Sequence, residues 1–83
     1  MENKTQQQHQ RIAERFGIPV QDVHWYWGGI CYARCAVKTI ESAQIISDAV
    51  KGQWVNGGWY DGMPLGKITK HDDGDYIWYE VTC

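Results

Sequence analysis

The sequence predicts a small α+β fold in which an antiparallel sheet is packed by helices. Three observations predict this class: two stretches with helix-cap residues and helical spacing, alternating segments joined by tight-turn residues, and an aromatic composition. The 83 residues include five tryptophans and five tyrosines, and 43% of all residues are hydrophobic. Since typical domains need roughly 100–150 residues, we expect residues 1–83 to form a single domain.

The first element is predicted to be a helix over residues 5–16. Thr5 followed by Gln8 matches a capping box, and Gly17 followed by Pro19 ends the helix. The apolar stripe of this helix is thin, so we expect it to dock on the sheet through one edge.

Residues 23–38 are predicted to form a β-hairpin around a two-residue turn at Gly28-Gly29. This turn pairs Trp27 with Ile30 and sets the register of the whole hairpin. His24 then lies on the face that includes Cys31, Ala33 and Cys35, and these small residues suit close packing against a helix. The opposite face is either a second core or an exposed platform, and both stay open; its large rings are Trp25, Trp27 and Tyr32.

The second half is predicted to contain a helix over residues 39–51, with Thr39 as its N-cap, followed by a β-rich region over residues 53–83. The predicted order is α-ββ-α-βββ, and its β-rich end contains short extended segments at 54–55 and 59–60 and a terminal hairpin around residues 71–74. The predicted core includes six aliphatic residues, namely Val37, Ile40, Ile46, Val50, Ile77 and Val81. The helical stripe also includes Ala49.

The three cysteines, an odd number, predict reduced thiols and a reducing compartment. Cys31 and Cys35 would lie on one strand about 13 Å apart, too far to form a disulfide. A bridge from one of them to Cys83 stays open. We find no apolar run near the ~20 residues of a membrane span, and therefore expect a cytoplasmic protein without membrane contact.

No sequence motif names a reaction, so we expect no enzyme, no catalytic residues, no metal and no cofactor. Residues 71–75 gather one histidine and three aspartates, but this spacing is typical of a hairpin turn rather than a calcium loop. A small-molecule pocket formed by Asn56, Trp59 and Asp61 stays open as an alternative function.

Residues 12–23 resemble the helix-turn-helix pattern of DNA-binding proteins, with Ala13, Gly17 and Val23 at the expected spacing. The recognition helix would span residues 19–27, which contain no lysine or arginine. A net charge of −2 also leaves no basic stripe for phosphates, so direct nucleic-acid binding is the weaker alternative.

The charges are distributed unevenly along the chain. Residues 1–38 hold five basic and three acidic side chains, whereas residues 39–83 hold three basic and seven acidic ones. Aromatic anchors beside carboxylates suit a basic partner surface, because rings supply contact area and acids steer association. The predicted partner-binding residues are Trp54, Trp59, Tyr60, Asp61, Met63, Asp72, Asp73 and Asp75.

In general character, the chain resembles the small inhibitors that phages make against bacterial defences, above all the anti-CRISPR proteins. The shared features are a short α+β chain, no catalytic motif, no targeting signal, and an acidic aromatic surface. The resemblance implies a non-enzymatic protein in the bacterial host cytoplasm that binds a protein or ribonucleoprotein complex and occludes its basic surface. The resemblance rests on no family motif, so it assigns no functional residue in this chain. A homodimer through the Trp25, Trp27 and Tyr32 face stays open.

Overall fold

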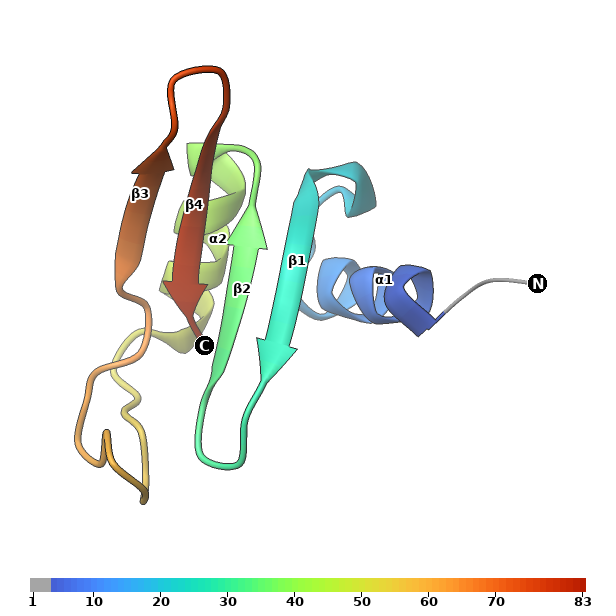
Figure 1. The fold of residues 1–83 in the computed structure, drawn as a ribbon. Coiled ribbons are helices and arrows are strands. Elements are labelled where there is room, and N and C mark those ends of the chain that lie inside the picture. The colour runs from blue at the N-terminus through green and yellow to red at the C-terminus, as the bar shows by residue number, and fades with distance from the viewer. Residues whose placement is uncertain (1–3) are drawn as a thin grey trace.

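The computed structural model describes residues 4–83, which form two α-helices and a four-stranded antiparallel sheet (Figure 1). This arrangement confirms the α+β class. The elements in chain order are α1 (Lys4–Phe16), a short 3-10 turn η1 (Val20–Asp22), β1 (Val23–Gly28), β2 (Ala33–Val37), α2 (Ile40–Val50), β3 (Ile68–Asp72) and β4 (Ile77–Thr82).

The sheet has the strand order β1-β2-β4-β3, so β4 lies between β2 and β3. Both β2 and β3 run antiparallel to β4, and the connection through α2 therefore joins two parallel strands across it. Figure 1 shows α2 behind the sheet and α1 beside its β1 edge, and buried residues of both helices share one core with the sheet. No helix of the described residues covers the opposite face of the sheet.

The core lies between the sheet and the two helices. Ile46 of α2 is fully buried, as are Cys35 and Val37 of β2 and Val81 of β4. α1 adds three buried residues, Ile12, Ala13 and Phe16. Each large apolar side chain removed from water contributes about 1.5–3 kcal/mol, which makes this layer the main source of stability.

The predicted N-cap of α2 is confirmed, and it is part of a larger network. Thr39 Oγ1 accepts a hydrogen bond from the Ser42 backbone N–H at 3.2 Å. The Asp22 carboxylate in turn accepts hydrogen bonds from the hydroxyls of Ser42 (2.8 Å) and Thr39 (3.1 Å). These contacts fasten η1 to the start of α2.

The predicted register of the first hairpin is wrong by four residues. Trp27 pairs with Arg34 rather than Ile30, and the turn is a four-residue loop closed by a hydrogen bond from Gly29 N–H to the Tyr32 carbonyl (2.9 Å). The longer loop allows Cys31 to pack against the backbone of the 53–67 segment. Because the shift is an even number of residues, Trp27 keeps its predicted face.

His24 is on the opposite face from the one predicted. The pairing changes between Val23↔Val37 and Trp25↔Ala36, so one extra residue sits in β1 as a β-bulge. The bulge allows Val23 to remain in the core while His24 joins Trp25 on the helix-free face.

Two predicted core residues are exposed instead. Ile40 is 44% exposed because it is the first residue of α2, and Ile77 is 42% exposed because β4 begins there, before its pairing with β2 starts at Tyr79. Ala49 of the predicted stripe is also exposed. The other four predicted core residues are buried, namely Val37, Ile46, Val50 and Val81.

The predicted strands at 54–55 and 59–60 do not form. Residues 53–67 make an irregular loop whose only ladder contact is a single bridge between Trp54 and Pro64. Its backbone folds on itself instead: the N–H groups of Val55 and Gly62 donate to the carbonyls of Met63 and Val55, both at 2.8 Å. The order is therefore α-ββ-α-ββ.

Within residues 4–83, no helix is long and apolar enough to cross a membrane.

Candidate functional site

The helix-free side of the sheet presents a continuous layer of large side chains. Antiparallel sheets with one solvent-facing side normally place polar residues there, so the unusual feature of this side is the set of large aromatic rings among its polar residues. We call this surface the open face, and its residues are His24, Trp25, Trp27, Arg34, Ala36, Thr69, His71, Tyr76, Trp78, Glu80 and Thr82.

Trp78 lies at the centre of the open face and contacts three other rings. His71 stacks on it with ring centres 3.9 Å apart and planes 10° apart. Trp25 meets it edge-on at 5.6 Å, and His24 lies tilted at 5.4 Å. Ala36, which pairs with Trp25 and Glu80, is fully buried although it lies outside the helix-packed core. The rings themselves therefore shield the sheet on this side.

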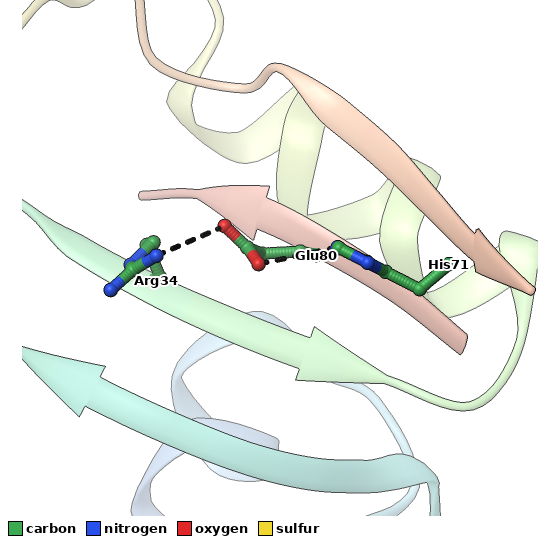
Figure 2. A network of polar contacts seen from close by, with 3 residues as sticks. All are labelled: Arg34, His71 and Glu80. Carbon is green, nitrogen blue, oxygen red and sulfur yellow. Dashed lines mark ion pairs between the residues drawn. The ribbon is translucent and has the colours of Figure 1, made fainter. Parts of the chain in front are cut away.

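Three charged or titratable side chains cross the open face beside the rings (Figure 2). Glu80 of β4 lies between Arg34 of β2 at 3.6 Å and His71 of β3 at 3.3 Å. The His71 contact lacks hydrogen-bond geometry, so it is an ion pair only when the imidazole is protonated. The Arg34 guanidinium also lies 4.9 Å from the Trp27 ring centre. Since Arg34 is 41% exposed, its ion pair contributes at most about 1 kcal/mol.

The open face is accessible to a partner. Trp27 is 43% exposed and Tyr76 is 39% exposed, while Trp25 and Trp78 are half-buried among their neighbours. Of the three rings for which the sequence left a second core or an exposed platform open, Trp27 is exposed and Trp25 is half-buried, whereas Tyr32 lies in the loop before β2. Exposed aromatic surface of this kind marks interaction sites.

The environment of His24 disfavours its charged form. Burial among the rings lowers the pKa of this imidazole, and the positive charges of Lys38 and His9 add to the effect, while Asp73 opposes it.

A second feature lies at the end of the sheet where the β1–β2 loop meets the 53–67 segment. There the two loops enclose a groove of about 370 Å³, which we call the end groove. Its lining is almost entirely apolar and consists of Trp27, Gly29, Ile30, Cys31, Tyr32, Gly57, Gly58, Trp59 and Tyr60. Ile30 and Trp59 are essentially fully exposed, at 104% and 99%.

The predicted site residues fall into two separate groups. The 53–67 segment precedes β3 and the acidic turn follows it, so the two lie at opposite ends of the strand (Figure 1). Trp59 and Tyr60 line the end groove, whereas the acidic group, Asp72, Asp73 and Asp75, is exposed around the β3–β4 turn. The structure does not bring the aspartates together with Trp59.

Two predicted contact residues shape the loop. The Asp61 carboxylate accepts a 2.6 Å hydrogen bond from Gly57 N–H, and the half-buried Met63 hydrogen-bonds through its backbone to Val55 and Tyr60. Trp54 is 64% exposed and lies with Asn56 along a different groove from Trp59. The pocket of Asn56, Trp59 and Asp61 suggested by the sequence is therefore wrong.

The acidic turn has the predicted hairpin geometry. Asp72 accepts a 3.0 Å hydrogen bond from Gly74 N–H, and Gly74 has a positive φ of 93°. Among residues 4–83, no group of three or more histidine, cysteine or carboxylate side chains is placed to hold a metal ion.

All three cysteines, which lie within the described range, are free thiols. Cys35 and Cys83 are buried in the core, and burial raises the pKa of Cys35 to about 12 and also raises that of Cys83. Cys31 lines the end groove.

The helix-turn-helix interpretation is wrong. Residues 19–27 contain only the short turn η1 and most of β1, so no recognition helix follows α1. Sequence reasoning also left out Trp78, Tyr76 and His71 as site residues. The alternation of residues 76–82 did place Tyr76, Trp78 and Glu80 on one face, and this was the signal available.

No protein-family model, curated protein or solved structure matches this chain in the comparisons made. Its function must therefore be inferred from the geometry of the open face and the end groove.

Proposed function

We propose that this chain is a non-enzymatic protein-binding domain that docks on its partner through the open face. One observation supports this most strongly: the helices share a core with one side of the sheet, while aromatic rings occupy the other. Tryptophan and tyrosine supply large contact areas at low entropic cost, which is why they dominate binding hot spots. The Trp27 and Tyr76 rings are the accessible members.

The partner is a protein or ribonucleoprotein complex with a basic surface. A standard interface buries about 800 Å² on each partner, roughly 28 Å across. The domain measures 36 × 33 × 21 Å. An interface about 28 Å across on the open face would therefore also include the aspartate turn at the end of that face. Carboxylates at the margin of an interface accelerate association with a basic partner.

The proposed biological role is inhibition by occlusion in the bacterial cytoplasm. A domain that covers a basic channel with an aromatic face and an aspartate turn at the end of that face prevents nucleic acid from entering it. This role follows the general resemblance to anti-CRISPR proteins, and the partner would then be a bacterial defence complex.

Affinity capture from bacterial lysate with matched baits tests the docking surface. Trp27→Ser removes a 43% exposed ring from the open face, and Ile45→Ser removes a 42% exposed side chain from α2 as the control. We expect one protein to be retained by wild type and by Ile45→Ser, and lost with Trp27→Ser. Equal retention by all three baits would contradict docking through the open face. Salt-sensitive retardation of random duplex DNA would instead favour nucleic-acid binding.

The acidic turn is tested with the captured partner. Replacing Asp72, Asp73 and Asp75 together by asparagine should slow association about tenfold at low salt and weaken its salt dependence. The amide introduced at position 72 retains an oxygen that can accept the Gly74 N–H, so the turn should remain intact. The control is Glu41→Gln with Asp48→Asn, which removes acidic charge from α2. If the control slows association equally, the effect is one of net charge rather than of the turn.

A further inference from the structure

We infer that the end groove is a binding site for the head group of a small organic quaternary ammonium ion. Its volume of about 370 Å³ lies within the range of small-molecule sites. The lining contains four aromatic side chains, Trp27, Tyr32, Trp59 and Tyr60. This site is separate from the proposed docking of a protein on the open face, although the two share Trp27.

The end groove is built by close backbone packing. A Cβ atom at Gly57 or Gly58 would lie 3.4 or 3.2 Å from the Cys31 sulfur, and both glycines have positive φ angles. On the other side, a Cβ at Gly29 would come within 2.7 Å of the Trp27 ring and 2.9 Å of the Tyr32 carbonyl. Gly57 and Gly58 therefore let the two loops approach closely, whereas Gly29 allows the β1–β2 loop to fold tightly on itself. The Asp61 bond to Gly57 holds the 57–61 turn.

Three of the lining rings pack against one another edge to face. Tyr32 is the central ring: Trp27 meets it at 5.5 Å and 60°, and Tyr60 meets it at 5.4 Å and 77°. Aromatic faces have negative electrostatic potential, and rings set at steep angles attract a cation placed among them. The Arg34 guanidinium already lies 4.9 Å from the Trp27 ring centre, so a cation occupies one face of this ring, and the rings of Tyr32, Trp59 and Tyr60 remain for the ligand.

The apolar lining determines which cation fits. A primary ammonium such as that of lysine would lose its hydrogen bonds to water and find almost no acceptor in the groove. A quaternary ammonium has no N–H group, so it loses no hydrogen bonds on entry. A quaternary ammonium therefore matches both the apolar surface and the ring potential.

Titration with choline tests the inference, with 3,3-dimethyl-1-butanol as the uncharged molecule of the same shape. The indole N–H signals of the five tryptophans report the site in proton–nitrogen NMR spectra. We expect choline to shift the Trp27 and Trp59 signals, to leave that of Trp54 unchanged, and to bind about tenfold more tightly than the alcohol. Equal affinity for the two would show a purely hydrophobic groove and overturn the inference, as would the absence of any shift.

Variants of Tyr60 provide an independent test. Tyr60→Leu removes the ring but keeps apolar volume, and we expect it to weaken choline binding about fivefold or more. Tyr60→Phe keeps the ring and should bind as wild type does. Trp54→Leu changes an exposed tryptophan outside the groove and should also bind normally. Unchanged choline affinity in Tyr60→Leu would contradict the inference, and a trimethyllysine peptide binding tenfold more tightly than choline would overturn the assignment to a free small molecule.

Discussion

The two faces of the sheet are covered in different ways. On the helix-packed face, small and aliphatic residues such as Cys35, Val37 and Val81 are completely buried under α1 and α2. On the open face, the rings of Trp25, Trp78 and their neighbours lie over the strands and contact one another. The same strands supply both faces through alternate residues.

The helix-packed face stabilises the fold, whereas the open face is available for binding. The helix-packed face has no accessible surface to offer, because helix side chains already occupy it. On the open face, the rings of Trp25, Trp78, His24 and His71 contact one another, and Trp27 and Tyr76 remain accessible. Rings that are fixed before binding lose little conformational entropy when a partner arrives.

The largest expected difference between regions concerns thiol reactivity. Because its pKa is about 12 rather than the ordinary 9.0, buried Cys35 should hold roughly a thousandfold less thiolate than a free cysteine at about pH 8. Cys83 is buried beside it, whereas Cys31 lies in the end groove. Iodoacetamide followed by mass spectrometry should therefore label Cys31 first in the folded protein, and all three thiols in urea. Early labelling of Cys35 would show that the core opens readily.

Truncation of the helix-packed core should cost the most stability. Ile46→Ala leaves a cavity at a fully buried position, and we expect a loss of about 2–5 kcal/mol in the free energy of unfolding. Trp27→Ala, at a 43% exposed position, should cost about 1 kcal/mol. Urea denaturation followed by circular dichroism measures both. A larger loss for Trp27→Ala would mean that the open face is the real core.

The centre of the open face should have an intermediate effect. Trp78→Ala removes contacts with His24, Trp25 and His71, and we expect a loss of about 2 kcal/mol in the same urea experiment. Trp78→Phe keeps an aromatic ring and should recover part of this loss. If Trp78→Ala is as stable as wild type, the ring layer contributes nothing and does not hold its members in place.

The smallest effect is the pH dependence that arises from His24. Its pKa is lowered in the folded protein, so the unfolded chain binds the proton more tightly. This contribution to stability is complete above the ordinary pKa of 6.5 and is lost as the pH falls from there toward the lowered value. His24→Asn should therefore lose less stability than wild type between about pH 7.5 and pH 5.5. Parallel curves for the two proteins would show that His24 does not contribute.

Local patterns in the sequence were sufficient to predict the helices and, except at the β-bulge beside His24, the faces of the observed strands. Thr39 capped α2 as expected. The alternation of residues 76–82 placed Trp78 and Val81 on opposite faces of β4. Side chains alternate between the two faces of a strand, so a pairing error of an even number of residues leaves each residue on its predicted face, as Trp27 shows. These features depend on neighbours in the chain.

Features that depend on tertiary packing were not predictable. The Gly28-Gly29 pair suggested a tight turn, but contact between Cys31 and the Gly57-Gly58 backbone accompanies a longer loop. The bulge at His24 and the exposure of Ile77 depend on where neighbouring strands begin and end. For the same reason, the sequence grouped Trp59 with Asp73, although β3 separates them.

The indole signals of the five tryptophans give the most direct test of the central claim, that the partner docks on the open face. The captured partner is added to nitrogen-labelled protein, and each indole N–H is followed by NMR. We predict that the signals of Trp25, Trp27 and Trp78 shift or broaden, while that of Trp54, on the 53–67 segment and 64% exposed, remains unchanged. Broadening confined to Trp54, with the three open-face signals unaffected, would contradict the account.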